Sequence, residues 1–387
     1  MTKLDYLPKI KPLSRPTVVE IDLKNLEHNL KVLRTIVGSD VNILAVVKAD
    51  AYGHGSIPIT KRLAEKGVWG FGVALVEEGI ELRLNKIENP ILVLNGVETY
   101  EALQYAIEYD LTPVIFNYYQ LSLFRDYIKR NGFKERLKVH LKVDTGMNRL
   151  GFTDEEFSRF IEEYWREFSW LSIEGVMSHL AYADDSEEEL TKRQYLKFKR
   201  VIERLHRIGI HPKYKHLANS ASIIRFPYTH FNMVRPGLML YGVNPTNGRF
   251  RVELDLKPVM RLKTKIIQIK MLKPGDRVSY GGSFVAKRPT KIAVLPIGYG
   301  DGIPRLLSNR GEVLVKGRRA KIVGNICMDL LMIDVTEIED IREGEDVIIL
   351  GRDGEEEISA ESIAALLGTI PYEVLTSISL RIPRNYL

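Results

Sequence analysis

The fold is indicated by one stretch of the sequence, Asn42-Ile43-Leu44-Ala45-Val46-Val47-Lys48-Ala49-Asp50-Ala51-Tyr52-Gly53-His54-Gly55. Its apolar run, residues 43–47, predicts a strand buried on both faces, as central strands of parallel sheets are. Lys48 ends that strand, just before a turn that contains Gly53 and Gly55. An amine in this position is partly desolvated, which lowers its pKa and suits it to forming a Schiff base. A solvated surface lysine is the alternative from this position alone.

Short apolar runs alternate with amphipathic helical stretches from about residue 40 to residue 242. Strands that alternate with helices over ~200 residues are typical of a parallel (β/α)8 barrel, a fold of the α/β class. A doubly wound sheet is the alternative, because periodicity does not determine the order of strands. The sequence predicts a barrel domain over residues 1–243. The eight runs are 43–47, 69–75, 91–94, 111–116, 137–143, 173–177, 214–217 and 233–240.

After Gly242 the helical rhythm mostly stops and strand-like alternation dominates. Turn signals such as Pro274-Gly275-Asp276 separate the strands, and one helix is expected at about residues 359–367. The sequence therefore predicts a mainly β C-terminal domain, residues 244–387. Residues 1–22 include a strand-like segment, 17–22, that is expected to pair with this second domain. The predicted strands are 259–271, 291–296, 311–315, 321–323, 331–335 and 347–350.

Composition limits the classes of partner. The 387 residues include 56 basic and 50 acidic side chains, a net charge of +6. Because both signs are mixed along the chain, nucleic-acid binding is not expected. One cysteine, Cys327, excludes an intramolecular disulfide and fits a reducing compartment. Residues 1–16 lack the apolar core of a signal peptide, and no window approaches a membrane span, so we expect a cytoplasmic protein without membrane contact.

Polar and charged residues follow several of the predicted barrel strands. Lys142 to Arg149 follow the fifth run, His179 the sixth, residues 216–221 the seventh, and Arg235 lies in the eighth. In barrels of this kind the chemistry lies at the carboxyl ends of the strands. Each residue alone has an ordinary structural explanation, such as a hydrogen-bonded core histidine or a surface ion pair. Their joint placement predicts an active site at that end of the barrel.

Two of these segments together predict a phosphate site. Ser220 opens a predicted helix, and Gly237 and Leu238 offer backbone N–H groups in a sterically open turn. A hydroxyl, a helix N-terminus and exposed amides form a cradle for phosphate oxygens. An ordinary helix N-cap is the alternative for the Ser220 segment.

The segment Lys-Ala-Asp-Ala-Tyr-Gly-His-Gly, residues 48–55, resembles the cofactor attachment motif of alanine racemases, and the resemblance continues through almost the whole chain. These are fold-type III pyridoxal-phosphate enzymes. The resemblance implies that Lys48 carries pyridoxal 5'-phosphate as a Schiff base. It also implies that Tyr52, Ser220, Gly237 and Leu238 hold the cofactor phosphate. No metal is expected.

Arg235 matches the arginine that faces the pyridine nitrogen of the cofactor in this family. Arginine only donates hydrogen bonds and stays protonated, so it does not protonate that nitrogen. The ring is then a weaker electron sink, which favours return of a proton to Cα over transamination. The electronics therefore favour a racemase over a fold-type III decarboxylase, whose ring nitrogen pairs with an acid. The resemblance also implies that His179 is hydrogen-bonded to Arg235.

The segment Val278-Ser279-Tyr280-Gly281-Gly282 resembles the second catalytic base of the family. Two-base racemisation needs one acid/base group on each face of the planar intermediate. Lys48 would serve one face and Tyr280 the other, with His179 assisting the tyrosine, whose free pKa is near 10. Without the resemblance, Tyr280 would be interpreted as a packed strand aromatic.

The resemblance also implies substrate contacts and an entrance. Arg149 would bind the substrate carboxylate and the phenolic oxygen of the cofactor, with Met328 nearby. Tyr372 would narrow the entrance and touch the phosphate, and Tyr299 matches another entrance loop. In the family, the residues matching Tyr280, Met328 and Tyr299 come from the neighbouring subunit. A homodimer with shared active sites is therefore expected.

Two positions depart from the pattern or vary within it. Asn325 stands where many members carry an arginine, which concerns the charge of the outer entrance and not the chemistry. Lys142 matches a lysine that some members carry as a carbamate, and a plain lysine is the alternative.

These features predict an isomerase, an alanine racemase that interconverts L-alanine and D-alanine and supplies D-alanine for the peptidoglycan of the cell wall. A broader amino-acid or serine racemase is the close alternative, because the sequence does not give the size of the pocket. A fold-type III decarboxylase is disfavoured by Arg235. A non-catalytic pyridoxal-phosphate carrier is disfavoured by the β-domain with Tyr280 and Met328. A barrel that only binds a phosphorylated ligand is the remaining alternative.

Overall fold

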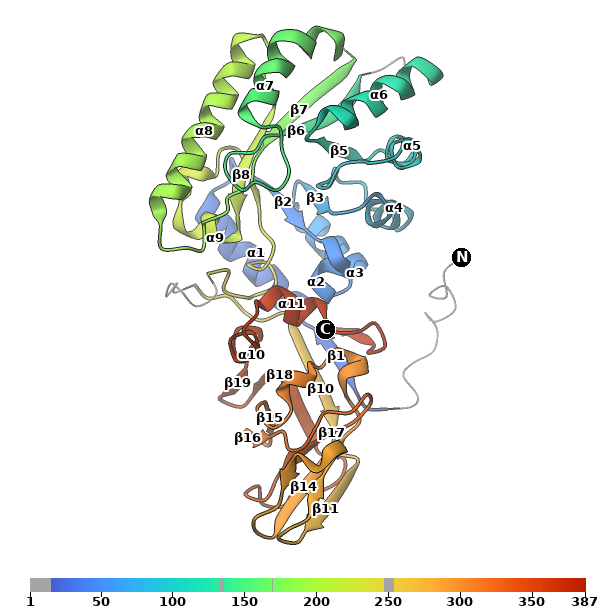
Figure 1. Ribbon diagram of the computed structural model, residues 1–387, viewed down its shortest axis with the longest axis vertical. Helices are drawn as coiled ribbons and strands as arrows, with labels where there is room; N and C mark the ends of the chain where they lie inside the picture. The colour runs from blue at the N-terminus through green and yellow to red at the C-terminus, as the bar shows by residue number, and fades with distance from the viewer. Residues whose placement is uncertain (1–14, 133–135, 169, 247–253) are drawn as a thin grey trace. The chain divides into compact units, whose positions relative to one another are not determined.

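The computed structural model describes residues 15–132, 136–168, 170–246 and 254–387. The chain forms two compact units (Figure 1). The barrel unit comprises Asn25–Lys257, and the β-unit comprises Met1–Lys24 together with Pro258–Leu387.

The barrel unit contains the predicted closed parallel barrel. Its strands follow one another in chain order around the barrel, and the first pairs with the last, Asn42 opposite Met233 and Ile43 opposite Val234. This closure confirms the (β/α)8 prediction and excludes the doubly wound sheet. The strands are β2 (Asn42–Val46), β3 (Gly70–Val73), β4 (Ile91–Val93), β5 (Thr112–Ile115), β6 (Leu137–Lys142), β7 (Leu171–Met177), β8 (Tyr214–Asn219) and β9 (Met233–Arg235).

Helices lie outside the barrel strands (Figure 1). The longest, α8 (Glu188–Arg207), shows why: Phe198, Val201 and Leu205 recur at helical spacing and are buried, while charged residues between them are exposed. None of the described helices combines the length and apolar character needed to span a membrane. The others are α1 (Leu23–Val37), α2 (Lys48–Gly53), α3 (Ser56–Glu65), α4 (Val76–Leu84), α5 (Tyr100–Glu108), α6 (Tyr118–Asn131), α7 (Asp154–Arg159) and α9 (Ser220–Arg225).

Side chains fill the inside of the barrel. One buried cluster draws a residue from each of six strands: Leu44, Leu92, Val114, Met177, Tyr214 and Met233. The barrel is therefore a packed core and not a pore.

The β-unit is built from strands that pair antiparallel, except for one parallel pair, which confirms the mainly β C-terminal domain. Its seven-stranded sheet has the order β16-β15-β18-β10-β1-β20, with β19 paired to β18. A three-stranded sheet has the order β11-β14-β17, and β12 and β13 form a separate pair. The strands are β1 (Val18–Ile21), β10 (Met260–Lys265), β11 (Gln268–Leu272), β12 (Arg277–Val278), β13 (Phe284–Val285), β14 (Thr290–Leu295), β15 (Glu312–Val315), β16 (Arg318–Lys321), β17 (Leu331–Asp334), β18 (Asp346–Asp353), β19 (Glu356–Ile358) and β20 (Arg384–Tyr386); the helices are α10 (Ala360–Leu367) and α11 (Pro371–Thr376).

Two details of the β-unit follow from backbone hydrogen bonds. Strand β1 pairs antiparallel with β10 and parallel with β20, so the N-terminal segment is part of this unit. The run 259–271, predicted as one strand, is two strands in different sheets. The split occurs because Ile266 N–H donates to Glu345 O while Ile267 N–H donates to Val294 O, so the chain changes sheet between these residues.

Candidate active site at the mouth of the barrel

Lys48 follows β2 and begins a left-handed turn. Ala49, Asp50, Ala51 and Tyr52 have φ values of 51°, 54°, 53° and 55°. Left-handed helical backbone costs L-residues about 1–2 kcal/mol each. Strain of this kind persists only where the surroundings hold it, and it concentrates at functional sites. Both Lys48 and Tyr52 belong to this short turn, so its backbone sets their relative positions.

Hydrogen bonds hold this turn from several sides. Ala49 N–H donates to Glu78 Oε1 at 2.7 Å, and Ala51 N–H donates to Val47 O at 2.8 Å. Asp50 Oδ1 accepts from Ser56 N–H at 2.6 Å. The strained segment is therefore anchored to α4, to the end of β2 and to the start of α3.

His54 supports the turn from the core. Its Nδ1 lies 3.0 Å from both Ala51 O and Tyr52 O, so the ring N–H donates to the carbonyls of the turn. The ring stacks on Tyr241, with centroids 4.5 Å apart, and Tyr241 donates to Val46 O at 3.0 Å. Both side chains are buried. This pair ties the turn to strand β2.

Cations gather at the mouth of the barrel. Lys48 is exposed, yet its pKa is lowered, first by desolvation and then by the charge of Arg149. Lys142 is buried, and burial, aided by the charges of Arg235 and Arg149, lowers its pKa to about 8. A lower amine pKa means that more of each lysine is neutral and nucleophilic. The positive potential suits phosphate and carboxylate ligands.

Arg235 is the most constrained of these cations. Its Nη1 donates to His216 O at 2.7 Å and lies 3.1 Å from His216 Nδ1. Its Nη2 donates to Ser178 O at 2.6 Å and Leu217 O at 3.1 Å. The same nitrogen lies 3.2 Å from His179 Nδ1. Burial lowers the pKa of Arg235 to about 9, so the guanidinium stays charged at neutral pH.

One N–H of Arg235 is left over. A guanidinium has five N–H donors, four on the terminal nitrogens and one on Nε. All contacts of Arg235 use the terminal nitrogens, and Nε has no acceptor within the described parts of the chain. The arrangement fixes the plane of the guanidinium and leaves one donor for a ligand atom.

The contact with Arg235 determines which ring nitrogen of His179 carries the proton. Because the guanidinium can only donate, His179 Nδ1 must accept. Burial, followed by the Arg235 charge, holds the pKa of His179 well below its usual value. The ring is therefore neutral and carries its proton on Nε2.

Backbone donors converge beside Ser220, the first residue of α9. Gly237 N–H donates to Ser220 Oγ at 2.8 Å, and Met239 N–H approaches the same oxygen at 3.5 Å. Leu238 N–H has no acceptor among the described residues. A Cβ on Gly237 would lie 2.6 Å from the Tyr52 hydroxyl, so only glycine lets that hydroxyl reach the cradle. The donor set fits a phosphate.

The loop after β6 carries Arg149. Asp144 Oδ1 accepts from Gly146 N–H and Met147 N–H, at 2.8 and 2.9 Å, which folds the loop back on itself. Arg149 is exposed and has no ion-pair partner among the residues that the structure describes. Gln194 of α8 donates to His179 O at 3.1 Å, which fixes the backbone at His179.

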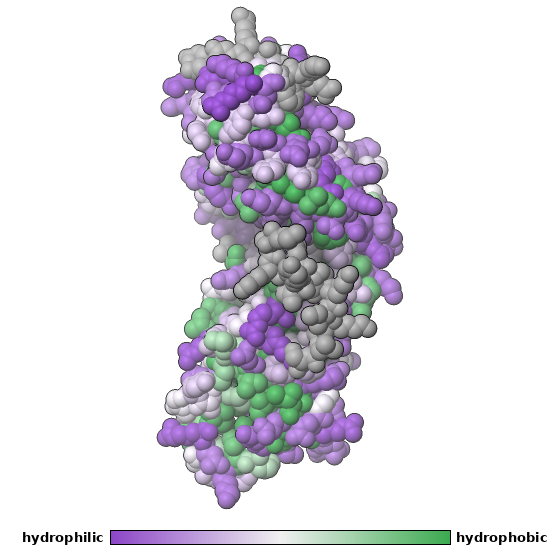
Figure 2. All heavy atoms as spheres, turned by 90° about the vertical axis from the view of Figure 1, so that its right-hand side faces the viewer, coloured by the Kyte–Doolittle hydropathy of each residue, from purple (hydrophilic) through white to green (hydrophobic). Residues whose placement is uncertain are grey.

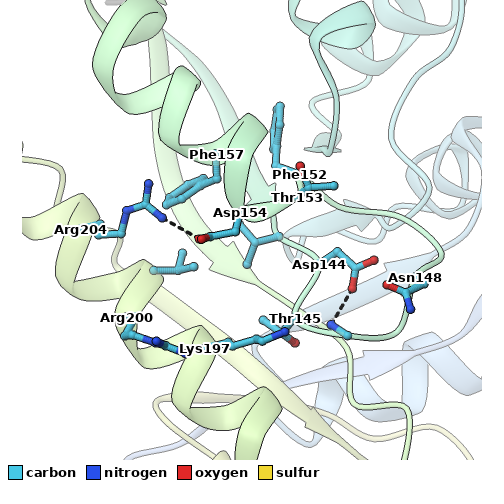
Figure 3. Close-up of a pocket in the computed structure, with 13 residues that line it drawn as sticks. Asp144, Thr145, Asn148, Phe152, Thr153, Asp154, Phe157, Lys197, Arg200 and Arg204 are labelled. Carbon is cyan, nitrogen blue, oxygen red and sulfur yellow. Dashed lines mark hydrogen bonds and ion pairs between the residues drawn. The ribbon is translucent and has the colours of Figure 1, made fainter.

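A cavity of about 520 Å³ is lined in part by this loop, through Asp144, Thr145 and Asn148 (Figure 3). It is walled by α8, which contributes Lys197 and Arg200, and by the start of α7. Arg204 forms an ion pair with Asp154 across it, at 2.8 Å. None of the predicted site residues lines this cavity. The candidate active site is thus indicated by its hydrogen bonds and charges and not by the shape of this pocket.

The β-unit carries the other predicted residues. Tyr280 begins a 3₁₀ turn, Tyr280–Gly282, and is 74% exposed. Asn325 Nδ2 donates to Tyr280 O at 2.7 Å, and Ser279 Oγ donates to Asn325 O at 2.5 Å. The asparagine that departs from the family pattern therefore holds the backbone of the Tyr280 turn.

Two loops of the β-unit are joined by backbone hydrogen bonds. Tyr299 N–H donates to Cys327 O and Gly300 N–H donates to Met328 O, both at 2.9 Å. Met328 and Tyr299 are exposed. The turn of Tyr280 is linked to the same loop through Asn325, so these three predicted residues share one region of the β-unit.

A buried carboxylate supports that region. Asp301 is fully buried and forms an ion pair with Arg15, which donates to both carboxylate oxygens. Burial raises the pKa of Asp301, but the hydrogen bonds from Arg15 and Gly298 lower it more. Tyr372 lies on α11, and Ser377 Oγ just after that helix donates to Gly302 O at 3.2 Å.

The structure thus brings Lys48, Tyr52, Arg149, His179, Ser220, Arg235, Gly237 and Leu238 to the barrel unit, and Tyr280, Met328 and Tyr372 to the β-unit. The sequence analysis assigned no supporting role to the residues that hold them, among them His54, Gln194, His140 and His216. A signal existed for His140, which lies two residues before Lys142 and so shares its face of the strand.

A closed (β/α)8 barrel with a lysine after its first strand, a phosphate cradle and a separate β-unit defines a barrel enzyme whose chemistry lies at the strand ends. The sequence profile of the alanine racemase N-terminal domain matches residues 21–245, and that of the C-terminal domain matches residues 259–386. The chain belongs to the alanine racemase family and is an isomerase.

Individual relatives agree with the profiles. An alanine racemase of Halothermothrix orenii is 46% identical over 379 residues, 97% of this chain and 98% of that protein. The structure is similar to alanine racemase of Clostridium difficile 630, with a TM-score of 0.89, 39% identity and coverage of 97% and 96%. Alanine racemase of Bartonella henselae with covalently bound pyridoxal phosphate matches with a TM-score of 0.87, 30% identity and coverage of 96% and 99%.

Proposed function

We propose that this protein interconverts L-alanine and D-alanine with pyridoxal 5'-phosphate as cofactor, by a two-base mechanism. Barrel residues 1–243 would bind the cofactor, and residues 244–387 would supply Tyr280 and Met328. Family membership supports the reaction, and the covalently bound cofactor of the Bartonella relative supports the choice of cofactor.

The observation that carries the proposal is the spare Nε–H of Arg235. Four N–H groups are committed to carbonyl oxygens and histidines, and the fifth is held in a fixed direction without an acceptor among the described residues. A pyridine nitrogen is an acceptor of the required kind. When bound, pyridoxal phosphate supplies an aldehyde that condenses with amines and a ring that withdraws electrons from Cα.

The remaining cofactor contacts follow from the donors at the mouth. Ser220 Oγ, the amides of Gly237 and Leu238, and the hydroxyl of Tyr52 would hold the phosphate. Lys48, with its lowered pKa, would form the covalent bond to the aldehyde. Tyr372 would close the phosphate side, as the resemblance suggests.

Proton transfer would use two groups on opposite faces of the substrate. Lys48 would remove or deliver the proton on one face and Tyr280 on the other. A free phenol titrates near pH 10, so tyrosine as a residue type needs a partner to act as a base. His179 would be that partner, since its Nδ1 accepts from Arg235 and its Nε2 faces away from that contact. Arg149 and Met328 would hold the substrate carboxylate.

We further propose a homodimer in which Tyr280 and Met328 of the partner subunit complete each site. Figure 2 shows hydrophobic side chains gathered on one face of the β-unit. In the same unit, the side chains of Tyr280, Met328 and Tyr299 are 74%, 53% and 43% exposed. Exposed apolar patches of this kind mark interaction surfaces. A two-fold dimer would bury the same surface on both subunits.

The physiological role would be the supply of D-alanine for peptidoglycan. The single cysteine fits a reducing compartment, and we propose the cytoplasm.

A chiral assay tests the proposal. Purified protein with pyridoxal phosphate is incubated separately with L-alanine, D-alanine, both serines and a panel of other amino acids, and the enantiomers are separated. We expect both alanines to converge on a racemic mixture faster than any other pair. Faster turnover of serine would establish the broader racemase. Release of carbon dioxide, or cofactor binding without turnover, would overturn the proposed reaction.

A further inference from the structure

Beneath the candidate site, a chain of buried hydrogen bonds extends from Arg235 into the barrel. His216 Nδ1 lies 3.1 Å from Arg235 Nη1, and His216 Nε2 lies 2.8 Å from His140 Nδ1. Neither histidine has any exposed surface, and Arg235 is 4% exposed. No role assigned so far uses His140.

Arg235 determines which atom donates and which accepts in each hydrogen bond of this series. Arginine only donates, so His216 Nδ1 accepts and a neutral His216 carries its proton on Nε2. That N–H donates to His140 Nδ1, which must therefore also accept. Burial holds the pKa of His216 well below its usual value and lowers that of His140 to about 3, so both rings are neutral. His140 then carries its proton on Nε2.

The barrel provides a fitted space for the His140 ring. A Cβ on Gly175 would lie 2.2 Å from His140 Nδ1, so any larger residue would displace the ring. The register of β6 and β7 shifts between Val139 and His140, which places His140 beside Gly175. The ring also stacks on Tyr214, with centroids 5.9 Å apart. Glycine, strand irregularity and aromatic neighbour together indicate a position shaped for an imidazole.

We propose that His140 is a positioning residue for the reaction, acting through His216 on Arg235. Its Nδ1 lone pair accepts the Nε2 proton of His216 and so stabilises the tautomer that the Arg235 contact requires, which keeps His216 Nδ1 an acceptor for Arg235. In the other tautomer an N–H of His216 would face an N–H of Arg235. The guanidinium would then lose an acceptor that orients it. This inference rests on the proposed contact between Arg235 and the cofactor ring.

Two other roles for His140 conflict with the geometry. A proton relay needs a chain that can reverse, but this chain begins at a donor-only guanidinium. It ends at His140 Nε2, which has no hydrogen-bond partner among the described residues. A purely space-filling role needs no acceptor at Nδ1. An apolar residue would fill the space without leaving a buried polar atom unsatisfied, which is costly.

Two variants of His140 with side chains of similar shape distinguish the positioning role from a space-filling role. In His140→Asn the side-chain oxygen can take the place of Nδ1 and accept from His216. In His140→Leu the shape is similar but the acceptor is lost. Each variant is prepared as the holoenzyme with pyridoxal phosphate. The wild type and each variant, labelled with ¹⁵N-histidine, are compared by two-bond ¹⁵N–¹H correlation spectra, which report which ring nitrogen carries the proton.

In wild type and His140→Asn we expect His216 with its proton on Nε2, and kcat within a fewfold of each other. In His140→Leu we expect His216 to populate the Nδ1–H tautomer, with kcat and cofactor affinity lower by on the order of ten- to a hundredfold. An Nδ1–H tautomer of His216 in wild type would overturn the inference. So would equal behaviour of the two variants, or a tautomer change that leaves kcat and cofactor affinity untouched.

The proposed function can fail separately. If wild-type holoenzyme does not racemise alanine, that proposal falls, while the wild-type spectrum still tests the direction of the hydrogen-bond chain. If wild type is active and the leucine variant equals the asparagine variant, only the role of His140 falls.

Discussion

Lys48 combines two properties that its neighbours produce together. The left-handed turn that follows directs the lysine, and desolvation with the nearby charge of Arg149 lowers the pKa of its amine. A lower pKa increases the neutral fraction of the amine, which is the form that attacks as a nucleophile. In the proposed reaction, the strained left-handed backbone after Lys48 would therefore serve to orient the lysine.

The first prediction concerns this lysine. Borohydride reduction of the holoenzyme should attach the cofactor to Lys48, located by peptide mapping, and Lys48→Ala should abolish turnover of both enantiomers. Lys142→Ala is the matched control, because Lys142 also has a lowered pKa. Lys142 itself should not take the label, so the variant should still be labelled on Lys48. Label on Lys142 or another lysine would refute the assignment.

The second prediction concerns Arg235. In Arg235→Glu a carboxylate would face the ring nitrogen and favour its protonation, which makes the ring a stronger electron sink. We expect slower racemisation and more pyridoxamine phosphate formed per turnover, measured by chromatography of the released cofactor. Arg149→Glu is the control for a general charge reversal at the mouth. If its product ratio matches that of Arg235→Glu, Arg235 does not contact the ring nitrogen.

At this scale, sequence patterns indicated the residues at the strand ends but not those that hold them. Lys48 was recognisable because an apolar run ends on it. The mutual contact of His140 and His216 was not, because a histidine within a strand has no local signal for its partner, which lies on another strand. Only closure of the barrel brings the two within 2.8 Å.

Among the elements, the left-handed turn α2 is the most unusual, and the third prediction tests it. Ala49 is exposed at φ 51°, so Ala49→Gly removes strain without removing packing. We expect a gain in the free energy of unfolding of up to about 1 kcal/mol. We also expect a lower kcat, because the lysine is less firmly directed. In the right-handed helix α5, Ala102→Gly should instead destabilise by about 0.5–1 kcal/mol. Equal destabilisation of both variants, measured by urea unfolding, would contradict the left-handed turn.

The fourth prediction concerns acid stability of the strands β6 and β8. The folded pKa of His140 is about 3, whereas an unfolded histidine titrates near 6.5. Below pH 6.5 the unfolded state therefore binds a proton that the folded state does not, so stability present above pH 6.5 is lost as the pH falls towards 3. For this residue the loss is about 1.4 kcal/mol per pH unit.

Urea unfolding of wild type and His140→Asn between pH 6 and pH 4 measures this difference. We expect the wild type to lose stability more steeply than the variant, which lacks the titrating ring. Parallel curves would show that His140 is protonated in the folded state.

Element positions were largely predictable, and the exceptions have physical causes. The barrel strands alternate with helices strictly enough for hydrophobic period alone to locate them. The left-handed turn has no propensity signal, because alanine and aspartate favour other backbone regions. The run 259–271 was predicted as one strand because its side chains alternate between apolar and polar throughout. The alternation continues where the backbone changes its hydrogen-bond partners from one sheet to the other, so the sequence gives no sign of the break.

For the whole molecule, the residues of the proposed reaction are divided between two units. Lys48 and Arg235 belong to the barrel unit, and Tyr280 and Met328 to the β-unit. The exposure of Tyr280, at 74%, is high for a proposed catalytic side chain within one chain. A partner subunit that covers this region would supply the desolvated setting that proton transfer requires. Sequence patterns identified both units, but the proposed sharing of sites came from the resemblance.

Complementation between two inactive variants tests the central claim, a two-base site shared by two subunits. Differently tagged Lys48→Ala and Tyr280→Ala proteins are mixed, allowed to exchange subunits, and purified through both tags. Each heterodimer then contains one site with both defects and one site with neither. We expect racemisation by the doubly tagged heterodimer at about half the wild-type rate per dimer, and none by either parent. Doubly tagged heterodimers without activity would show that Lys48 and Tyr280 act within one chain, or not as a pair of bases, and would contradict the account.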